Sequence, residues 1–234
     1  MTVTTNLANV FAKAGLSVNR IGSRKRRLFN EYQINHVLDV GANSGQFAQG
    51  LRKHVGYAGE IISFEPLSAA FQALEAAARR DSKWKTLNCA LGNEEGRLEI
   101  NISENLVSSS FLQMLPECEA AAPHARYVSK ETVSVHTLDS LYNSYGVTSG
   151  NVYLKIDTQG FEKQILDGAK DALPQIDTVE LELSLAPLYN DQLLFSEMCE
   201  FMSQLGYSVV SIEPGFSDPS SGRMLQVDGV FHRY

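Results

Sequence analysis

The sequence predicts an α/β protein in which helices cover both faces of a doubly wound, mostly parallel sheet. After residue 35, short apolar runs alternate with segments of helical composition, which is the pattern of repeated strand–helix units. The chain has 234 residues, of which 44% are hydrophobic and 20% charged, and this composition suits one large core. The first apolar run ends in a glycine-containing turn, the place where open α/β sheets bind ligands. Together these features predict one main α/β domain.

The first half of this domain opens with three predicted strands, at residues 36–40, 60–64 and 85–91. Each is a short apolar run of strand length. Residues 46–55 and 67–81 separate the strands and have the composition of helices. The order of elements is therefore that of a doubly wound sheet.

The middle of the chain interrupts this alternation. Residues 97–103 carry apolar side chains at every second position after a turn, so they predict an added strand. The long irregular stretch 104–130 is a candidate lid, because a loop of this length in a compact domain is functional or mobile. Residues 131–136 predict a strand that runs into a short helix capped by Thr137.

The second half returns to strand–helix units. Its predicted strands lie at residues 151–157, 178–185, 207–212 and 224–234. Helical segments are expected at residues 161–173 and 193–206, and the second is amphipathic. The glycine, proline and serine residues of the segment 213–223 require a loop before the final strand.

Charge divides the chain into two parts. Residues 1–34 predict a helical N-terminal arm of two helices with six basic residues and one acid, whereas the chain as a whole has a formal net charge of −7. The main domain, residues 35–234, is therefore acidic, which excludes nucleic acid as a partner because a duplex binder needs a positive face. Two interpretations of the arm stay open. Its basic helix face docks on the acidic domain, which we favour, or it meets an anionic acceptor.

The sequence predicts a cytoplasmic protein. No stretch approaches the ~20 apolar residues that a membrane helix needs, and the first residues lack the pattern of a signal peptide. Cys89, Cys118 and Cys199 are odd in number and far apart, so we expect reduced packing residues and neither disulfides nor a zinc cluster.

The turn after the first strand, in HVLDVGANSGQF, is the most informative local motif. A dinucleotide site needs GxGxxG to bring a pyrophosphate to the backbone, but here Asn43 stands at the second glycine position. Asp39 adds a negative charge at the strand end, which suits a ligand with an ammonium or sulfonium group. Gly41 permits the turn and Gly45 permits a close backbone approach.

The second predicted strand ends in Glu65, twenty residues after Gly45. An acid at this place accepts hydrogen bonds from both hydroxyls of a ribose. The two motifs together predict a ligand that carries a ribose and a positive charge but no pyrophosphate. This combination resembles the S-adenosylmethionine site of the seven-strand methyltransferases.

Later segments strengthen the resemblance and make it more specific. They are, in order, NCALGNEEG, SSSF, SVHTLDSLY, KIDTQGFEKQILDGA, ELSLAPLYNDQ and GRMLQVDGVF. These blocks resemble those of the FkbM-type methyltransferase family over residues 25–234. The resemblance implies a seven-strand Rossmann-like sheet with an antiparallel last strand, S-adenosylmethionine as cofactor, and a hydroxyl as methyl acceptor.

The resemblance also implies a donor site. Its expected residues are Asp39, Gly41, Ala42, Asn43 and Gly45 around the methionine part, Glu65 and Pro66 at the ribose, Asn88 and Ala90 near the adenine, and Ser109 from the SSSF segment. Asp157 stands where the family has the acid that closes its fourth strand. Many members have Glu where this chain has Gln159, so a role that depends on charge at that position is not carried over.

Strand periodicity places the candidate catalytic residues, Asp157 and Glu182. Asp157 shares a face with Lys155, and Glu182 shares a face with Glu180 on the next predicted strand. Buried charges need partners, so we expect Lys155 to pair with Glu180 or Glu182 and to leave Asp157 nearest the ligand crevice. A divalent ion held by Asp157 and Glu182 is the alternative, but no further oxygen ligand is evident and we expect no metal.

The sequence therefore predicts an S-adenosylmethionine-dependent O-methyltransferase that acts on a sugar, glycan or natural-product hydroxyl. The acceptor is a small molecule or glycan that is anionic or carrier-linked if the basic arm binds it, and a homodimer stays open. One alternative is a catalytically silent S-adenosylmethionine-binding module, which Gln159 makes more credible. A nicotinamide-dependent oxidoreductase is a weaker alternative, because GxGxxG is absent.

Overall fold

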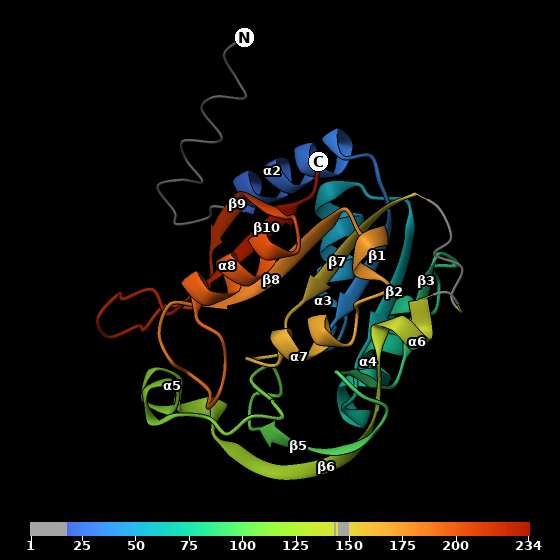
Figure 1. Ribbon diagram of the computed structural model, residues 1–234. Helices are drawn as coiled ribbons and strands as arrows, with labels where there is room; N and C mark the ends of the chain where they lie inside the picture. Colours follow the sequence, from blue (N-terminus) through green and yellow to red (C-terminus); the bar gives the residue numbers. More distant parts are fainter. Residues whose placement is uncertain (1–17, 143, 145–149) are drawn as a thin grey trace, which may run out of the picture.

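A computed structural model describes residues 18–142, 144 and 150–234. Its main sheet has seven strands in the order β3-β2-β1-β7-β8-β10-β9, and the last strand in sequence, β10, runs antiparallel to both neighbours (Figure 1). The other strands run parallel to one another, as the alternating sequence pattern predicts. The doubly wound α/β fold is therefore confirmed.

The elements follow the predicted order closely. The strands of the main sheet are β1 (Ile34–Val40), β2 (Glu60–Phe64), β3 (Trp84–Leu87), β7 (Asn151–Ile156), β8 (Thr178–Ser184), β9 (Ser208–Pro214) and β10 (Gln226–His232). The helices are α2 (Val18–Glu31), α3 (Gln46–Gly50) with the π-helical turn η1 (Leu51–Val55), α4 (Ser68–Ala78), α5 (Pro116–Ala121), α6 (Leu138–Tyr142), α7 (Glu162–Asp167) and α8 (Phe195–Gln204). Of the two helices expected in the arm, α2 is described and the earlier one lies outside the described residues.

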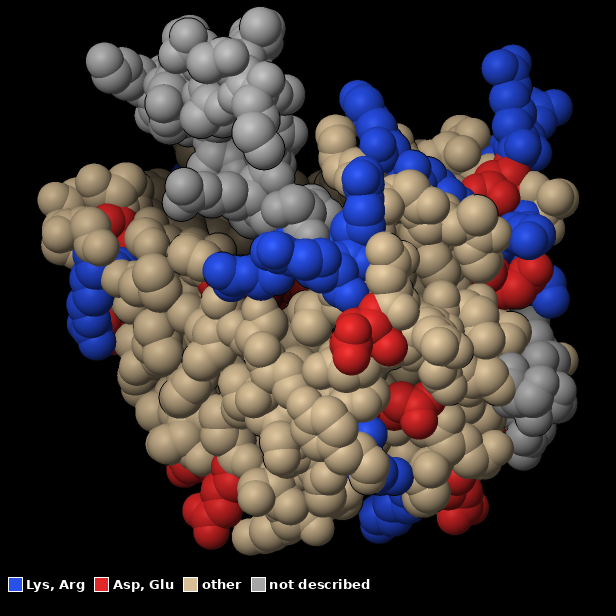
Figure 2. Space-filling view, turned by 90° about the horizontal axis from the view of Figure 1, so that it is seen from above, with Lys and Arg blue, Asp and Glu red and all other residues tan. Residues whose placement is uncertain are grey.

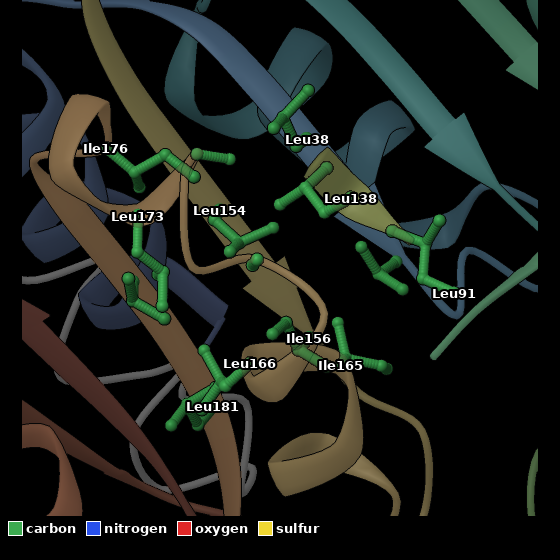
Figure 3. Close-up of a cluster of buried hydrophobic side chains, with 14 of the residues drawn as sticks. Leu38, Leu91, Leu138, Leu154, Ile156, Ile165, Leu166, Leu173, Ile176 and Leu181 are labelled. Carbon is green, nitrogen blue, oxygen red and sulfur yellow. The ribbon is translucent and has the colours of Figure 1, made fainter. Parts of the chain in front are cut away.

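Two apolar clusters pack the sheet from opposite faces. One joins side chains of β1, β7 and β8 to α6, α7 and α8, and Figure 3 shows its leucine and isoleucine side chains converging from both strands and helices. The other joins Val37, Ile61 and Tyr153 to α2, α3, η1 and α4. Apolar burial on both faces is what a parallel sheet requires, and it leaves only the strand ends open for a site.

A small second sheet lies beside the main one, with the order β4-β6-β5 (Figure 1). It contains β4 (Ala90–Leu91), β5 (Gly96–Ser103) and β6 (Tyr127–His136). The strand predicted at residues 85–91 is therefore wrong as one element, because the chain leaves the main sheet after Leu87 and enters the second sheet at Ala90. Asn88 holds this corner by donating from Nδ2 to the carbonyls of Glu65 (2.9 Å) and Pro66 (3.0 Å).

The candidate lid is shorter than predicted. Within 104–130 the structure has α5, a 3₁₀ turn η2 (Pro123–Ala125) and the first residues of β6. The side chains of Cys118 and Ala125 are buried in a cluster with Leu188 and Tyr189. Their apolar burial folds this half of the segment onto the domain, and only the stretch before α5 remains a loop. The cap of α6 is as predicted, since Thr137 Oγ1 accepts from the amide of Ser140 at 3.1 Å.

Helix α2 is fixed to the domain by its basic side chains. Lys25 is buried, and its Nζ lies 2.7 and 2.6 Å from the two carboxylate oxygens of Glu180 on β8. Arg24 and Arg26 donate to backbone carbonyls of β9 and η1. Figure 2, a view from above onto the side that carries α2, shows basic side chains projecting from this face. These are the contacts expected if the basic face of the arm docks on the main domain.

Candidate active site

A cavity of about 290 Å³ opens at the carboxyl ends of the central strands. Its wall is formed by the turn after β1, the end of β2, the corner 89–91, the loop 106–111 and the segment that follows β7. The order of β1 and β7 in the sheet marks the point where the chain reverses its direction of winding. This is the place where doubly wound sheets bind ligands.

The turn after β1 brings backbone into direct contact with β7. Gly41 has φ +75°, and a Cβ added to it would lie 2.0 Å from the carbonyl oxygen of Asp157. The amides of Gly41 and Ala42 both donate to the carbonyl of Phe64. Asn43 has a left-handed backbone conformation with φ +47°. Only glycine fits at position 41, for steric as well as conformational reasons.

Gly45 is closely surrounded by side chains of neighbouring elements. A Cβ at this position would lie 2.8 Å from the Trp84 ring and 3.0 Å from the Leu74 side chain. The residue begins α3 with φ +83° and does not line the cavity. Gly45 thus lets the first turn of α3 pack closely on α4 and β3.

Glu65 is fixed by backbone amides on both of its carboxylate oxygens. Asn43 donates to Oε2 at 2.7 Å and Leu67 donates to Oε1 at 2.9 Å. The side chain lines the cavity, although only 4% of the residue is exposed. Burial raises the pKa of Glu65 to about 7, against the opposing effect of the two amides. Each oxygen keeps a second lone pair, so the carboxylate can still accept from a diol in the cavity.

Asp39 lies beneath the cavity wall. The residue is fully buried, Ser63 Oγ donates to its Oδ2 at 3.1 Å, and its Oδ1 has no hydrogen-bond partner among the described residues. Lys155 Nζ is 3.8 Å from Oδ1. Burial raises the pKa of Asp39, and the charge of Lys155 opposes that rise. Asp39 therefore balances Lys155 and does not itself line the cavity.

Lys155 has partners other than those expected from the sequence. Its Nζ donates to Asp157 Oδ2 at 3.1 Å, in addition to its approach to Asp39. It stands opposite Glu180 in the sheet register, but Glu180 is bound by Lys25 and by the hydroxyl of Tyr153. The predicted pairing of Lys155 with Glu180 or Glu182 is thus wrong, because the arm supplies the cation for Glu180.

Gln159 joins the two candidate catalytic carboxylates. Its Nε2 donates to Asp157 Oδ1 at 3.2 Å and to Glu182 Oε2 at 2.6 Å. The Tyr189 hydroxyl donates to Oε1 of the same amide at 2.8 Å. Gln226 Nε2 adds a second donor to Glu182 Oε2 at 2.7 Å. The end of β7, β8, β10 and the loop after β8 are thereby connected in one hydrogen-bonded network.

The cavity brings together most of the residues that the sequence singled out. Those on its wall are Gly41, Ala42, Asn43, Glu65, Pro66, Ala90, Ser109 and Asp157. Asp39, Gly45, Asn88 and Glu182 do not line it. Asp157 is the more accessible carboxylate of the pair, with 37% of its side chain exposed.

The sequence did not single out the apolar part of the wall. Phe47, Phe111, Phe161, Leu106 and Val107 also line the cavity. Apolar residues of this kind are expected in any core, so no signal in the sequence separates them from packing residues. The flat adenine ring that the sequence predicts needs such a surface to pack on. Phe111 and Phe161 pack together with ring centroids 4.8 Å apart.

The described residues contain no group of three histidine, cysteine or acidic side chains placed to hold a metal. Both oxygens of Asp157 face nitrogen donors, from Lys155 and Gln159. His136 bonds to Glu95 and His232 to Thr178, and neither lines the cavity. Within the same part of the chain, no helix is long and apolar enough to cross a membrane.

Comparison with known proteins identifies what this arrangement resembles. A family model described as the methyltransferase FkbM domain matches residues 39–209. No curated protein matches the chain. Among solved structures, the FkbM methyltransferase of Methylobacillus flagellatus KT has 14% sequence identity and a TM-score of 0.53, over 84% of this chain and 43% of that one. This chain thus spans less than half of that protein.

Two further solved structures are similar at lower scores. A putative RNA methyltransferase from Pyrococcus horikoshii has 14% identity and a TM-score of 0.48, over 91% of this chain and 84% of that one. The magnesium protoporphyrin IX methyltransferase of Synechocystis, solved with bound S-adenosylmethionine, has 7% identity and a TM-score of 0.49, over 92% and 79%.

Proposed function

The chain belongs to the FkbM methyltransferase domain family, and from this premise we propose that it is an O-methyltransferase acting on a hydroxyl of a sugar, a glycan or a natural product. S-adenosylmethionine is the cofactor of this family, and it supplies an activated methyl group as a sulfonium. The residues proposed to bind the cofactor are Gly41, Ala42, Asn43, Glu65, Pro66, Ala90 and Ser109 on the cavity wall, together with Asp39, Gly45 and Asn88, which do not line it. Glu65 suits a ribose, Gly41 leaves the backbone uncovered, and the buried Oδ1 of Asp39 adds negative charge beneath the wall.

The observation that supports a hydroxyl acceptor is the position of Asp157. Its carboxylate is the exposed acid at the carboxyl end of β7, beside the glycine turn. Methyl transfer to an alcohol must release the hydroxyl proton, and a placed base contributes typically ~10²–10⁴-fold to such a reaction. Asp157 accepts that proton, while Lys155 holds its other oxygen in place and stabilises its charge.

The acceptor group that enters the cavity is proposed to be uncharged. Lys155 is the cation on the wall among the described residues, and it is already engaged by Asp157 and Asp39. The neighbouring side chains Asp157 and Gln159 offer oxygen and amide groups, which suit hydroxyls rather than phosphates. Any anionic carrier on the acceptor would have to bind outside this cavity.

The contacts of helix α2 leave only part of its basic cluster available to an anionic acceptor. Lys25 forms a buried ion pair with Glu180 on β8. Replacing all four basic residues 24–27 would therefore disturb folding as well as any acceptor contact. Arg27 is the exposed member for which no bond to another described residue is found, and it remains the candidate contact for an anionic carrier. Cytoplasmic location and a homodimer stay predictions.

A transfer assay with labelled methyl donor tests the proposed function. The full chain is incubated with neutral sugars, polyol natural products and carrier-linked anionic sugars. We expect label in an ether linkage that resists mild base, which distinguishes it from a methyl ester. Donor binding without transfer to any acceptor of the panel would favour the silent binding module. Binding of NAD in place of S-adenosylhomocysteine would instead favour the oxidoreductase.

A further inference from the structure

We propose that Lys25 of helix α2 is a positioning residue for methyl transfer. It binds Glu180, and this leaves Lys155 to hold the proposed base, Asp157. The inference rests on the proposed function in taking Asp157 as that base. It adds to that function a part for the N-terminal arm, which acts on the site through another lysine because Lys25 does not line the cavity.

A row of charged residues crosses the central strands of the main sheet. Asp39 on β1 is the register partner of Lys155 on β7, and Lys155 is the register partner of Glu180 on β8. Register partners on neighbouring strands direct their side chains to the same face of a sheet. Asp157 lies two residues after Lys155 and shares this face. One ammonium group is therefore surrounded by three acids.

Lys155 pairs with only two of these acids. Its Nζ donates to Asp157 Oδ2 at 3.1 Å and lies 3.8 Å from Asp39 Oδ1. Among the described residues it forms no ion pair with Glu180, its partner in the register. The side chain of Lys155 is 11% exposed, so water screens its attraction to a neighbouring carboxylate only weakly.

Glu180 is bound by a second cation. Lys25 Nζ lies 2.7 Å from Glu180 Oε1 and 2.6 Å from Oε2. The hydroxyl of Tyr153 donates to the same Oε2. Both oxygens of this buried carboxylate are thus engaged by groups other than Lys155.

The two lysines meet at one aromatic ring. Lys25 Nζ lies 4.8 Å and Lys155 Nζ 5.2 Å from the centroid of the Phe47 ring, which lines the cavity. An ammonium group over an aromatic face is favourable. The cation from the arm is therefore held next to the cation of the site, each with its own acid.

Loss of Lys25 would create a competitor for Asp157. Glu180 would become a buried carboxylate without its cation, which is strongly unfavourable, and Lys155 stands beside it in the register. An ammonium carries one charge, so a close pair with Glu180 weakens its pair with Asp157. Asp157 would then lose the donor that fixes its Oδ2.

Crystal structures with S-adenosylhomocysteine bound test this competition without a known acceptor. In Lys25→Met we expect Lys155 Nζ within hydrogen-bond distance of Glu180 and farther from Asp157 than in the wild type. In Glu180→Gln the pair of Lys155 with Asp157 should stay. An unchanged pair of Lys155 with Asp157 in Lys25→Met overturns the proposal. Should Lys25→Met not fold, Lys25→Gln takes its place, because it keeps an N–H for Glu180 without the charge.

Turnover with an acceptor found in the transfer assay separates positioning from stability. Lys25→Met and Glu180→Gln break the same buried pair, so both should lower thermal stability. Only Lys25→Met displaces Lys155, so its kcat should fall roughly 10- to 100-fold, measured where both variants are folded. Glu180→Gln should lose far less. Equal losses of kcat in the two variants would mean that the pair is merely structural, and would overturn the proposal.

The double variant Lys25→Met/Glu180→Gln supplies the rescue. With no carboxylate at position 180, Lys155 has no competing partner there, so most of the kcat lost in Lys25→Met should return. Recovery of thermal stability without recovery of kcat contradicts the proposal. Near wild-type turnover in Asp157→Asn would instead contradict the proposed function, whatever partner Lys155 has in the crystal structures.

Discussion

The two sides of the cavity are built from different kinds of groups. On the side proposed to bind the donor, formed by the turn 41–43 and Glu65 and called the donor side, the bonds that fix the site come from backbone amides. On the side proposed for methyl transfer, formed by Lys155, Asp157, Gln159 and Glu182 and called the transfer side, they come from side chains of different segments.

The difference shows what determines the positions of the binding groups on each side. Backbone amides are placed by the fold itself, so a donor common to many relatives can be held by a glycine turn and one acid. A side-chain network depends on the register of several strands and changes with single residues. The donor side is therefore suited to a constant ligand, and the transfer side to a variable one.

The largest expected effect lies on the transfer side alone. Asp157→Asn keeps the shape but removes the base, so kcat should fall by ~10²–10⁴-fold while S-adenosylhomocysteine affinity changes little. Steady-state kinetics and calorimetry measure the two quantities separately. Near wild-type turnover would remove Asp157 from its role, and full loss of wild-type activity on treatment with a strong chelator would point to a metal instead.

On the donor side we expect the reverse result, in which donor affinity falls and kcat changes little. Glu65→Ala removes a carboxylate that two charge-assisted hydrogen bonds from a ribose would use, which weakens binding by about 1.5–3 kcal/mol, or roughly 10- to 150-fold in Kd. Turnover at saturating donor should change far less. If Glu65→Ala lowered kcat as strongly as Asp157→Asn does, the two sides would not be separable.

The ionisation of Glu65 gives the donor side a pH dependence. Its pKa is raised to about 7, and ribose hydroxyls favour its ionised form, so binding must expel a proton below pH 7. Affinity for S-adenosylhomocysteine should therefore rise between pH 5.5 and about 7, by at most ~tenfold per pH unit, and then level off. Calorimetry at several pH values measures it, and Glu65→Gln should remove the dependence.

The same group affects stability with the opposite sign. The pKa of Glu65 is higher in the folded protein than in the unfolded chain, so between these two pKa values the ligand-free folded protein binds more protons than the unfolded chain. The contribution of Glu65 to the free energy of unfolding therefore falls as pH rises through that interval. A Glu65→Gln variant should lose that part of the decline in thermal unfolding.

The smallest effect should come from the second layer of the donor side. Asn88→Ala removes two hydrogen bonds to the carbonyls of Glu65 and Pro66 without touching the cavity. We expect a weakening of S-adenosylhomocysteine binding of about 0.5–1.5 kcal/mol, with kcat unchanged. A change larger than that of Glu65→Ala would mean that Asn88 contacts the donor directly.

Local sequence carries more of the geometry of the donor side than of the transfer side, for the same physical reason. Strand, glycine turn and acid follow one another locally in HVLDVGANSG and IISFEP, so their spacing carries the geometry. The partner of Lys155 depends instead on Lys25, which reaches β8 from a helix 155 residues away in sequence. No local pattern records that contact.

Two other features were beyond the sequence for related reasons. The apolar run 85–91 reads as one strand, because the bonds of the Asn88 side chain that divide it are tertiary. The bridge made by Gln159 depends on the side-by-side placement of β7 and β8 and on a left-handed backbone, neither of which composition reveals. The overall α/β order was predictable because it rests on periodicity alone.

Gly41 has a consequence for the evolution and redesign of this protein. A side chain there would strike the carbonyl of Asp157, so a substitution of Gly41 displaces the proposed base as well as the proposed donor site. New acceptor ranges must therefore arise elsewhere on the cavity. The rim loop offers the freedom, because Leu106 and Val107 line the cavity and are 37% and 52% exposed. A library that varies these two positions and leaves 41 and 157 untouched explores acceptors while the chemistry stays constant.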